Sequence, residues 1–191
     1  MAATLERKPL LSISTSVFAL GGLVWFGTTL ARMIVGFDMF NPGTTVLKSA
    51  QSEAVQLHTV WLFTMLGGWS GWAYAVAGLG GLAALLLSMR SWRDKGWILM
   101  SGLLFATTLP GQVWIILQDI ELWTLFDSGT GLPLASAEDV MGVFLKRMTD
   151  VASSVVNGLT ILMALTIVLV LAWQPLRRPE PLTNPTETEA E

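Results

Sequence analysis

Four long apolar stretches, separated by shorter polar ones, dominate the pattern of hydrophobic and polar positions along this chain of 191 residues. They cover about residues 12–35, 70–89, 97–118 and 151–173. Because a helix rises about 1.5 Å per residue, roughly 20 apolar residues cross the hydrocarbon core of a bilayer. The pattern therefore predicts an all-α integral membrane protein, in which residues 1–174 form a bundle of four transmembrane helices.

The connection between the first and second spans begins with a turn signal and continues with helical spacing. The turn is predicted at Asn41-Pro42-Gly43, and residues 44–66 have the pattern of a helix. The segment 55–66 is too short to span and too apolar for water, so we expect it to lie in the interface, to re-enter the membrane or to pack on the spans. Gly67-Gly68 then predicts a break or a bend before the second span, with a single long kinked helix as the alternative.

The connection between the third and fourth spans has the same plan. Ser136 followed by Asp139 predicts a helix N-cap with an acidic partner, and the helical pattern continues from there into the last span. We therefore expect two outer loops, each with an amphipathic or interfacial helix. An internal repeat is suggested by a short similarity, in which Phe37-Asp38 corresponds to Phe126-Asp127.

Composition and charge refine the membrane interpretation. The chain is 52% hydrophobic and 13% charged, whereas a typical soluble domain is about 25% charged. Residues 175–191 are rich in proline and glutamate and predict a disordered cytoplasmic tail. The absence of cysteine excludes disulfides and cysteine metal sites.

The distribution of basic residues predicts the orientation. Those on the side of the two termini are Arg7, Lys8, Arg90, Arg93, Lys95, Arg177 and Arg178. The opposite side has fewer basic residues, and acidic residues outnumber them there. By the positive-inside rule both termini are cytoplasmic and the two longer connections face outward, and we expect a bacterial inner (plasma) membrane.

Polar residues on the third and fourth spans recur at helical spacing and predict a polar seam. Gln112 is seven residues from Asp119, and Asn157 is seven from Asp150, so each amide lies about 10 Å below an outer carboxylate. Two interpretations stay open: hydrogen bonds between helices, worth about 0.6 kcal/mol on average, or the lining of a polar path. The seam comprises Ser101, Thr108, Gln112, Asn157 and Thr160.

A charge cluster is predicted at the outer rim of the spans. Arg32 near the end of the first span lies at about the depth of Asp119 and Asp150. One cation would then meet two carboxylates, and the spare carboxylate would have a raised pKa. The cluster is interpreted either as an ion or proton entry site or as a structural clasp between spans.

The only histidine, His58, is a candidate for contact with a ligand or cofactor, together with Trp61 and Trp69. A quinone or other lipid-soluble molecule beneath the segment 55–66 would use these flat aromatic surfaces. Because a haem or metal site needs further ligands at recognisable spacing, we expect no metal site and no resident cofactor.

Glycine and alanine on the first two spans allow close helix approach, within the bundle, between copies or with partner subunits. The sequence has no catalytic constellation, phosphate-binding loop or basic tract for nucleic acid, so an enzyme is not expected. The leading hypothesis is a non-catalytic accessory or assembly subunit of a membrane complex, surrounded by the lipid bilayer. The first alternative is a small oligomeric channel or transporter using the polar seam, and the second is a subunit associated with quinone, lipid, haem or metal.

Overall fold

The computed structural model describes residues 7–89 and 96–174, which fold into helices and connecting loops. The expected tail, residues 175–191, lies outside the described residues. All the described helices except α5 are long and apolar enough to cross a membrane, as expected of a four-span membrane protein. The helices are α2 (Arg7–Phe37), α3 (Glu53–Ser88), α4 (Gly96–Trp123), α5 (Ala137–Thr149) and α6 (Val151–Trp173).

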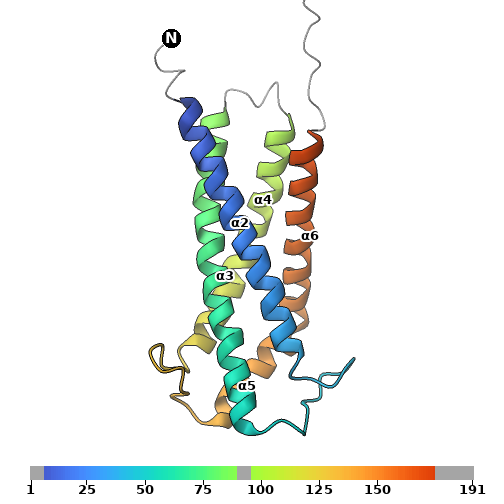
Figure 1. Cartoon of the computed structure of the whole chain (residues 1–191). Coiled ribbons are helices and arrows are strands. Elements are labelled where there is room, and N and C mark those ends of the chain that lie inside the picture. Colours follow the sequence, from blue (N-terminus) through green and yellow to red (C-terminus); the bar gives the residue numbers. More distant parts are fainter. Residues whose placement is uncertain (1–6, 90–95, 175–191) are drawn as a thin grey trace, which may run out of the picture.

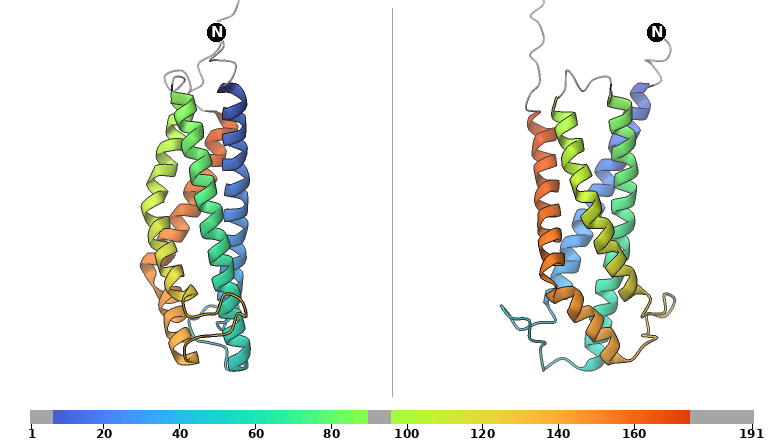
Figure 2. Two further views of the ribbon diagram at one scale, coloured as in Figure 1. Left: turned by 90° about the vertical axis from the view of Figure 1, so that its left-hand side faces the viewer. Right: turned by 180° about the vertical axis from the view of Figure 1, so that it is seen from behind.

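The four long helices lie side by side, and α5 lies across one end of the bundle (Figures 1 and 2). The two longer connections are at the same end as α5, whereas α2 begins and α6 ends at the opposite end. The spans are longer than predicted, since α3 alone has 36 residues. At about 1.5 Å per residue it is about 54 Å long, against about 30 Å for a hydrocarbon core.

The expected break at Gly67-Gly68 is absent, and the alternative of one long helix is correct. Residues 55–66 are the first turns of α3, which begins at Glu53, so the first connection has no separate helix. The glycines serve packing instead. A Cβ at Gly67 would lie 3.0 Å from Arg32 Cζ, and one at Gly68 would lie 2.8 Å from the Trp123 ring.

The helix of the second connection begins with the predicted cap but ends earlier than predicted. The Ser136 hydroxyl accepts a hydrogen bond from the Asp139 backbone N–H at 3.2 Å, which starts α5. The helix does not continue into the last span, because Asp150 has extended backbone angles and separates α5 from α6. The Asp150 carboxylate instead caps α6 by accepting from the Ser153 N–H at 2.9 Å, so the chain changes direction there.

The two longer connections share one loop geometry. Each contains an isolated antiparallel bridge, Phe40 with Leu47 and Phe126 with Pro133. Each bridge is closed by two backbone hydrogen bonds of 2.8 to 3.0 Å, and each loop has a glycine in the left-handed region, with φ of 75° and 71°. The two connections are therefore alike in structure, with Phe40 rather than Phe37 as the counterpart of Phe126.

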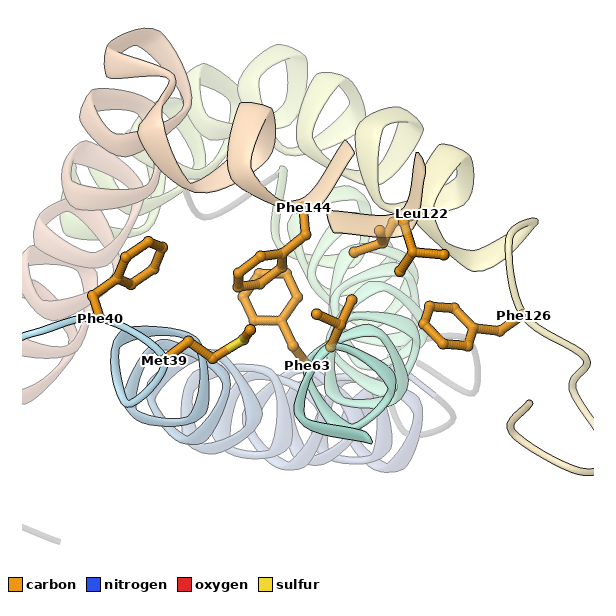
Figure 3. Packing of buried hydrophobic residues seen from close by; sticks show 8 residues of the cluster. Met39, Phe40, Phe63, Leu122, Phe126 and Phe144 are labelled. Atoms are coloured by element: carbon orange, nitrogen blue, oxygen red, sulfur yellow. The ribbon is translucent and has the colours of Figure 1, made fainter. Parts of the chain in front are cut away.

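The largest buried hydrophobic cluster lies at the end of the bundle that holds α5. The Phe144 ring of α5 packs edge-on against Phe63 of α3, with 5.2 Å between ring centroids, and stacks on Phe40 at 6.2 Å (Figure 3). Such aromatic pairs contribute about 0.5–1.5 kcal/mol beyond the area they bury. This cluster holds α5 against α3 and so determines which face of α5 is turned toward the bundle. Its members are Met39, Phe40, Val60, Phe63, Leu122, Phe126, Val140 and Phe144.

The small residues of the first two spans are used where α2 crosses α3. A Cβ at Gly21 would lie 2.8 Å from Ala77 N, and a Cβ at Gly80 would lie 2.7 Å from Phe18 N. Both distances are shorter than side chains tolerate, so the two backbones touch only because these positions are glycine. Of the three uses that the sequence left open for these glycines, the structure shows packing within the chain.

Candidate functional site

Two arginines and one aspartate meet in the interior of the bundle. Arg32 of α2 binds Asp119 of α4 through two hydrogen bonds, Nη1 to Oδ2 and Nη2 to Oδ1, each 2.5 Å long. Arg147 of α5 donates from Nε to the same Oδ1 at 3.3 Å. The side chains are 8%, 12% and 7% exposed in the order Arg32, Asp119, Arg147. We call these three residues the ion triad.

One face of α3 holds the Arg32 guanidinium in place. The Cζ atom lies 4.0 Å from the centre of the Phe63 ring, an arrangement that contributes about 2 kcal/mol where the cation is desolvated. Gly67, one helical turn further along, leaves room for the other edge of the guanidinium. Phe63 and Gly67 are four residues apart, so a single helical face supplies both the aromatic surface and the space beside it.

The composition of the triad differs from the predicted charge cluster. The structure brings Arg32 and Asp119 together, but Asp150 forms no ion pair with Arg32 or Arg147, and the third member is Arg147. Hydrogen bonds from the hydroxyl and the backbone N–H of Ser153 hold the pKa of Asp150 below its usual range, opposite to the raised pKa expected. The triad therefore has two cations and one carboxylate, instead of one cation and two carboxylates.

The spacing of residues along α5 places Arg147 on the buried face of the helix. Val140, Phe144 and Arg147 are spaced by four and three residues, so they share one face of α5. All three are buried. A charged residue on the apolar face of an amphipathic helix predicts a buried partner, and here that partner is Asp119.

A cavity of about 100 Å³ adjoins the triad. Gln112 and Asn157 both line it, so the structure brings these two amides of the seam to one place. Neither amide forms a side-chain hydrogen bond with another described residue. A single water needs about 10–15 Å³ of such space, so the cavity has room for a polar group of several atoms. We call it the polar cavity; its polar lining includes Arg32, Asp119, Arg147, Gln112, Ser154 and Asn157.

The rest of the seam is closed by hydrogen bonds. The hydroxyls of Ser101, Thr108 and Thr160 each donate to a backbone carbonyl three or four positions earlier in the same helix, at 2.7 to 2.9 Å. Thr108 also lies 2.7 Å from the Tyr74 hydroxyl, which is left to act as the donor in that pair. All three seam hydroxyls are buried, and none of them lines the polar cavity.

A larger, open groove of about 680 Å³ runs between α3 and α4. Three glycines of α3, Gly67, Gly68 and Gly71, lie along it, and tryptophans from both helices flank them. The groove and the polar cavity adjoin, because Gly71, Ile116 and Asp119 line both. We call it the lateral groove; it is lined by Met65, Gly67, Gly68, Trp69, Gly71, Trp72, Ala75, Ile116, Asp119, Ile120 and Trp123.

The three residues proposed to contact a ligand do not converge. His58 is exposed near the start of α3, whereas Trp61 packs against Trp123 and Phe126 with ring centroids 5.9 and 5.4 Å apart. Only Trp69 lines the lateral groove. Within residues 7–89 and 96–174, no cluster of three or more histidine, aspartate or glutamate side chains is arranged to hold a metal ion.

This arrangement of side chains is suited to binding a ligand. Guanidinium and amide groups line the polar cavity, and an apolar groove on the outside of the bundle adjoins it. No protein-family model matches the chain, and no curated protein or solved structure matches it either. A functional interpretation therefore depends on the geometry of the lateral groove and the ion triad.

Proposed function

We propose that this chain is a non-catalytic protein of the bacterial inner membrane that binds a membrane lipid in the lateral groove. The observation that carries the proposal is the shape of the groove, about 680 Å³ of largely apolar space whose lining includes Asp119 of the ion triad. Binding sites for small molecules are mostly apolar, enclose about 300–1,000 Å³ and contain a few convergent polar groups. A groove on the outside of a membrane bundle meets acyl chains before any other ligand.

The glycine at position 71 supports an occupant in the groove. Glycine destabilises a helix interior by about 0.5–1 kcal/mol relative to alanine. Packing within the chain does not require it here, because a Cβ at Gly71 would lie 3.6 Å from the nearest atom, on Ile116, at ordinary contact distance. A missing side chain at this position keeps the floor of the lateral groove low, which favours a ligand lying against α3.

The depth of the ion triad suits a lipid whose polar end is bound there. Arg32 lies five residues before the end of α2 at Phe37, about 8 Å along the helix axis. Asp119 lies four residues before the end of α4 at Trp123, about 6 Å along that axis. Both are near the level of lipid head groups, and the positive-inside rule assigns that level to the outer leaflet.

The other two functions suggested by the sequence have less support. Gly21 and Gly80, which suggested a surface for assembly, are covered by the α2–α3 contact. The hydroxyls of Ser101, Thr108 and Thr160 donate within their own helices, which argues against a continuous polar path along the seam. Lipid binding is compatible with an accessory role in a membrane complex, and we retain that role within the proposal.

A glycine pair on α3 tests the proposal. Gly71→Leu fills the lateral groove, while Gly78→Leu adds the same side chain two turns away, outside the groove, where a Cβ has its nearest neighbour at 3.7 Å. Each variant is purified in mild detergent, and the lipids that remain bound are counted by native mass spectrometry and identified after extraction. We expect the wild type and Gly78→Leu to retain lipid and Gly71→Leu to lose most of it. Equal retention in all three proteins contradicts the proposal.

A further inference from the structure

We infer that the polar cavity is an oxyanion site that binds the phosphate of an anionic phospholipid whose chains lie in the lateral groove. The inference rests on the function proposed above and names the class of lipid. Three features of the site carry it: the charge balance of the ion triad, the donors that face the cavity and the junction between the cavity and the groove.

The first feature is an excess of positive charge in a buried place. Arg32 and Arg147 share the single carboxylate of Asp119, so the ion triad has a net charge of +1. Removing a charge from water costs several kcal/mol even after the protein relaxes, unless an opposite charge accompanies it. An anion in the adjoining polar cavity supplies that charge.

The nearest remaining carboxylate does not take this place. Asp150 is close enough to attract the charge of Arg147, but it is tied to the start of α6. The hydroxyl and the backbone N–H of Ser153 both donate to one oxygen of Asp150, at 2.5 and 2.9 Å. Asp150 does not line the polar cavity, so among the described residues Asp119 is the only carboxylate that does.

The second feature is a set of donors without acceptors. Arg32 Nε is buried and has no hydrogen-bond partner among the described residues. Arg147 engages Asp119 through Nε, and its two terminal nitrogens form no hydrogen bond with another described residue. For Arg32 Nε, which is buried, the missing partner costs about 1–3 kcal/mol, and more because the group is charged. Phosphate oxygens accept several hydrogen bonds from guanidinium groups at once, so a phosphate satisfies this need.

The third feature is the junction between the polar cavity and the lateral groove. Asp119 and Ile116 of α4 and Gly71 of α3 line both spaces, so the polar cavity and the lateral groove lie directly beside each other. The space of about 100 Å³ exceeds what a carboxylate fills and suits a phosphodiester. A lipid with a net charge of −1, such as phosphatidylglycerol, neutralises the triad, whereas phosphatidylethanolamine brings its own ammonium group.

The test compares the two head groups. The protein is offered equal amounts of phosphatidylglycerol and phosphatidylethanolamine with identical chains in nanodiscs or mixed micelles, and the bound lipids are measured by native mass spectrometry. We expect the wild type to prefer phosphatidylglycerol about tenfold, and Arg147→Met to bind both lipids about equally. Lys146→Met, which removes the same charge from the exposed neighbouring position, keeps the preference.

Arg147→Gln guards against misfolding of Arg147→Met, because its amide still reaches Asp119 while the charge is removed, and we expect the same loss of preference. No preference in the wild type, or an unchanged preference in whichever Arg147 variant folds, overturns the inference. The glycine pair tests lipid binding independently of the head group. If the inference about phosphate fails but the lateral groove does bind lipid, Gly71→Leu still loses lipid and Gly78→Leu still retains it. Inorganic phosphate provides a final arm, and if it stabilises the wild type while phosphatidylglycerol fails to compete with it, the site takes a free anion and the inference is wrong.

Discussion

Arg32 and Asp119, 87 positions apart in the chain, form a two-pronged ion pair with both N–O distances at 2.5 Å. The pair joins α2, which packs along α3, to α4, which packs along α6. It also recruits Arg147 from α5, so one carboxylate connects three helices.

Asp119→Asn should destabilise the protein by about 3–5 kcal/mol, because two buried guanidinium groups lose their only shared anion. Asp38→Asn is the matched control, since Asp38 binds Lys48 at 2.8 Å in an exposed pair, and breaking such a pair changes stability by less than about 1 kcal/mol. Unfolding in mixed micelles, followed by circular dichroism, measures both variants. Equal small losses would show that the triad does not stabilise the bundle.

Gly67→Ala should also destabilise the protein, by about 1–3 kcal/mol, because the added methyl group lies 3.0 Å from Arg32 Cζ and displaces the guanidinium. Gly27→Ala has no atom within 4 Å of the new methyl group, so it should be neutral or stabilising by up to about 1 kcal/mol. The same unfolding measurement separates the two outcomes. A Gly67→Ala variant as stable as the wild type would show that the Arg32 guanidinium can shift without lowering the free energy of unfolding.

Phe144→Ala should cost about 3–5 kcal/mol, since it removes a fully buried ring that contacts Phe63 and Phe40. Because this ring holds α5 in place, the variant should also weaken the contact of Arg147 with Asp119. Hydrogen exchange should therefore rise over α5 more than over α6. Uniform exchange over both helices would show that α5 is held by other contacts.

Asp150→Ala should lower the melting temperature at pH 7 by a few degrees, because α6 loses its N-cap. The folded-state pKa of Asp150 is depressed by its hydrogen bonds with Ser153. The stabilisation by the carboxylate is therefore fully present above the unfolded pKa of about 3.9, and it is lost as the pH falls through the lower folded value.

The difference between the wild type and Asp150→Ala should accordingly narrow as the pH is lowered below about 4. Asp150→Asn is the control, since asparagine caps about as well as aspartate but does not titrate. Its melting temperature should stay near that of the wild type at pH 7. A difference between the wild type and Asp150→Ala that is constant from pH 7 to pH 3 would contradict the role of the ionised cap.

Several features of the fold were predictable because they depend on neighbouring residues only. The cap at Ser136 needs an acceptor beside free backbone donors, and Asp139 completes it three positions later. The break at Gly67-Gly68 was predicted wrongly because glycine marks either a bend or a close approach. Only the position of Arg32 and Trp123 against α3 shows that close approach is the reason here.

The candidate site was predictable in part. The seven-residue offsets placed Gln112 and Asn157 at matching depths, and the structure brings both amides to the polar cavity. The same reasoning paired Arg32 with Asp119 but chose Asp150 as the third member. Spacing along a span gives only the depth of a side chain in the bilayer. Depth does not distinguish a carboxylate that caps its own helix from one that faces the interior of the bundle.

Four helices long and apolar enough to cross a membrane follow from the sequence alone, because the length of an apolar stretch and the residues that cap it act over a few turns of one helix. The sign of the buried charge follows only from how the helices pack together. That sign depends on α5 folding back under the bundle, where the packing of Phe144 places Arg147 against Asp119. No periodicity within a single helix specifies such a meeting, since it arises from contacts among helices that are distant in the chain.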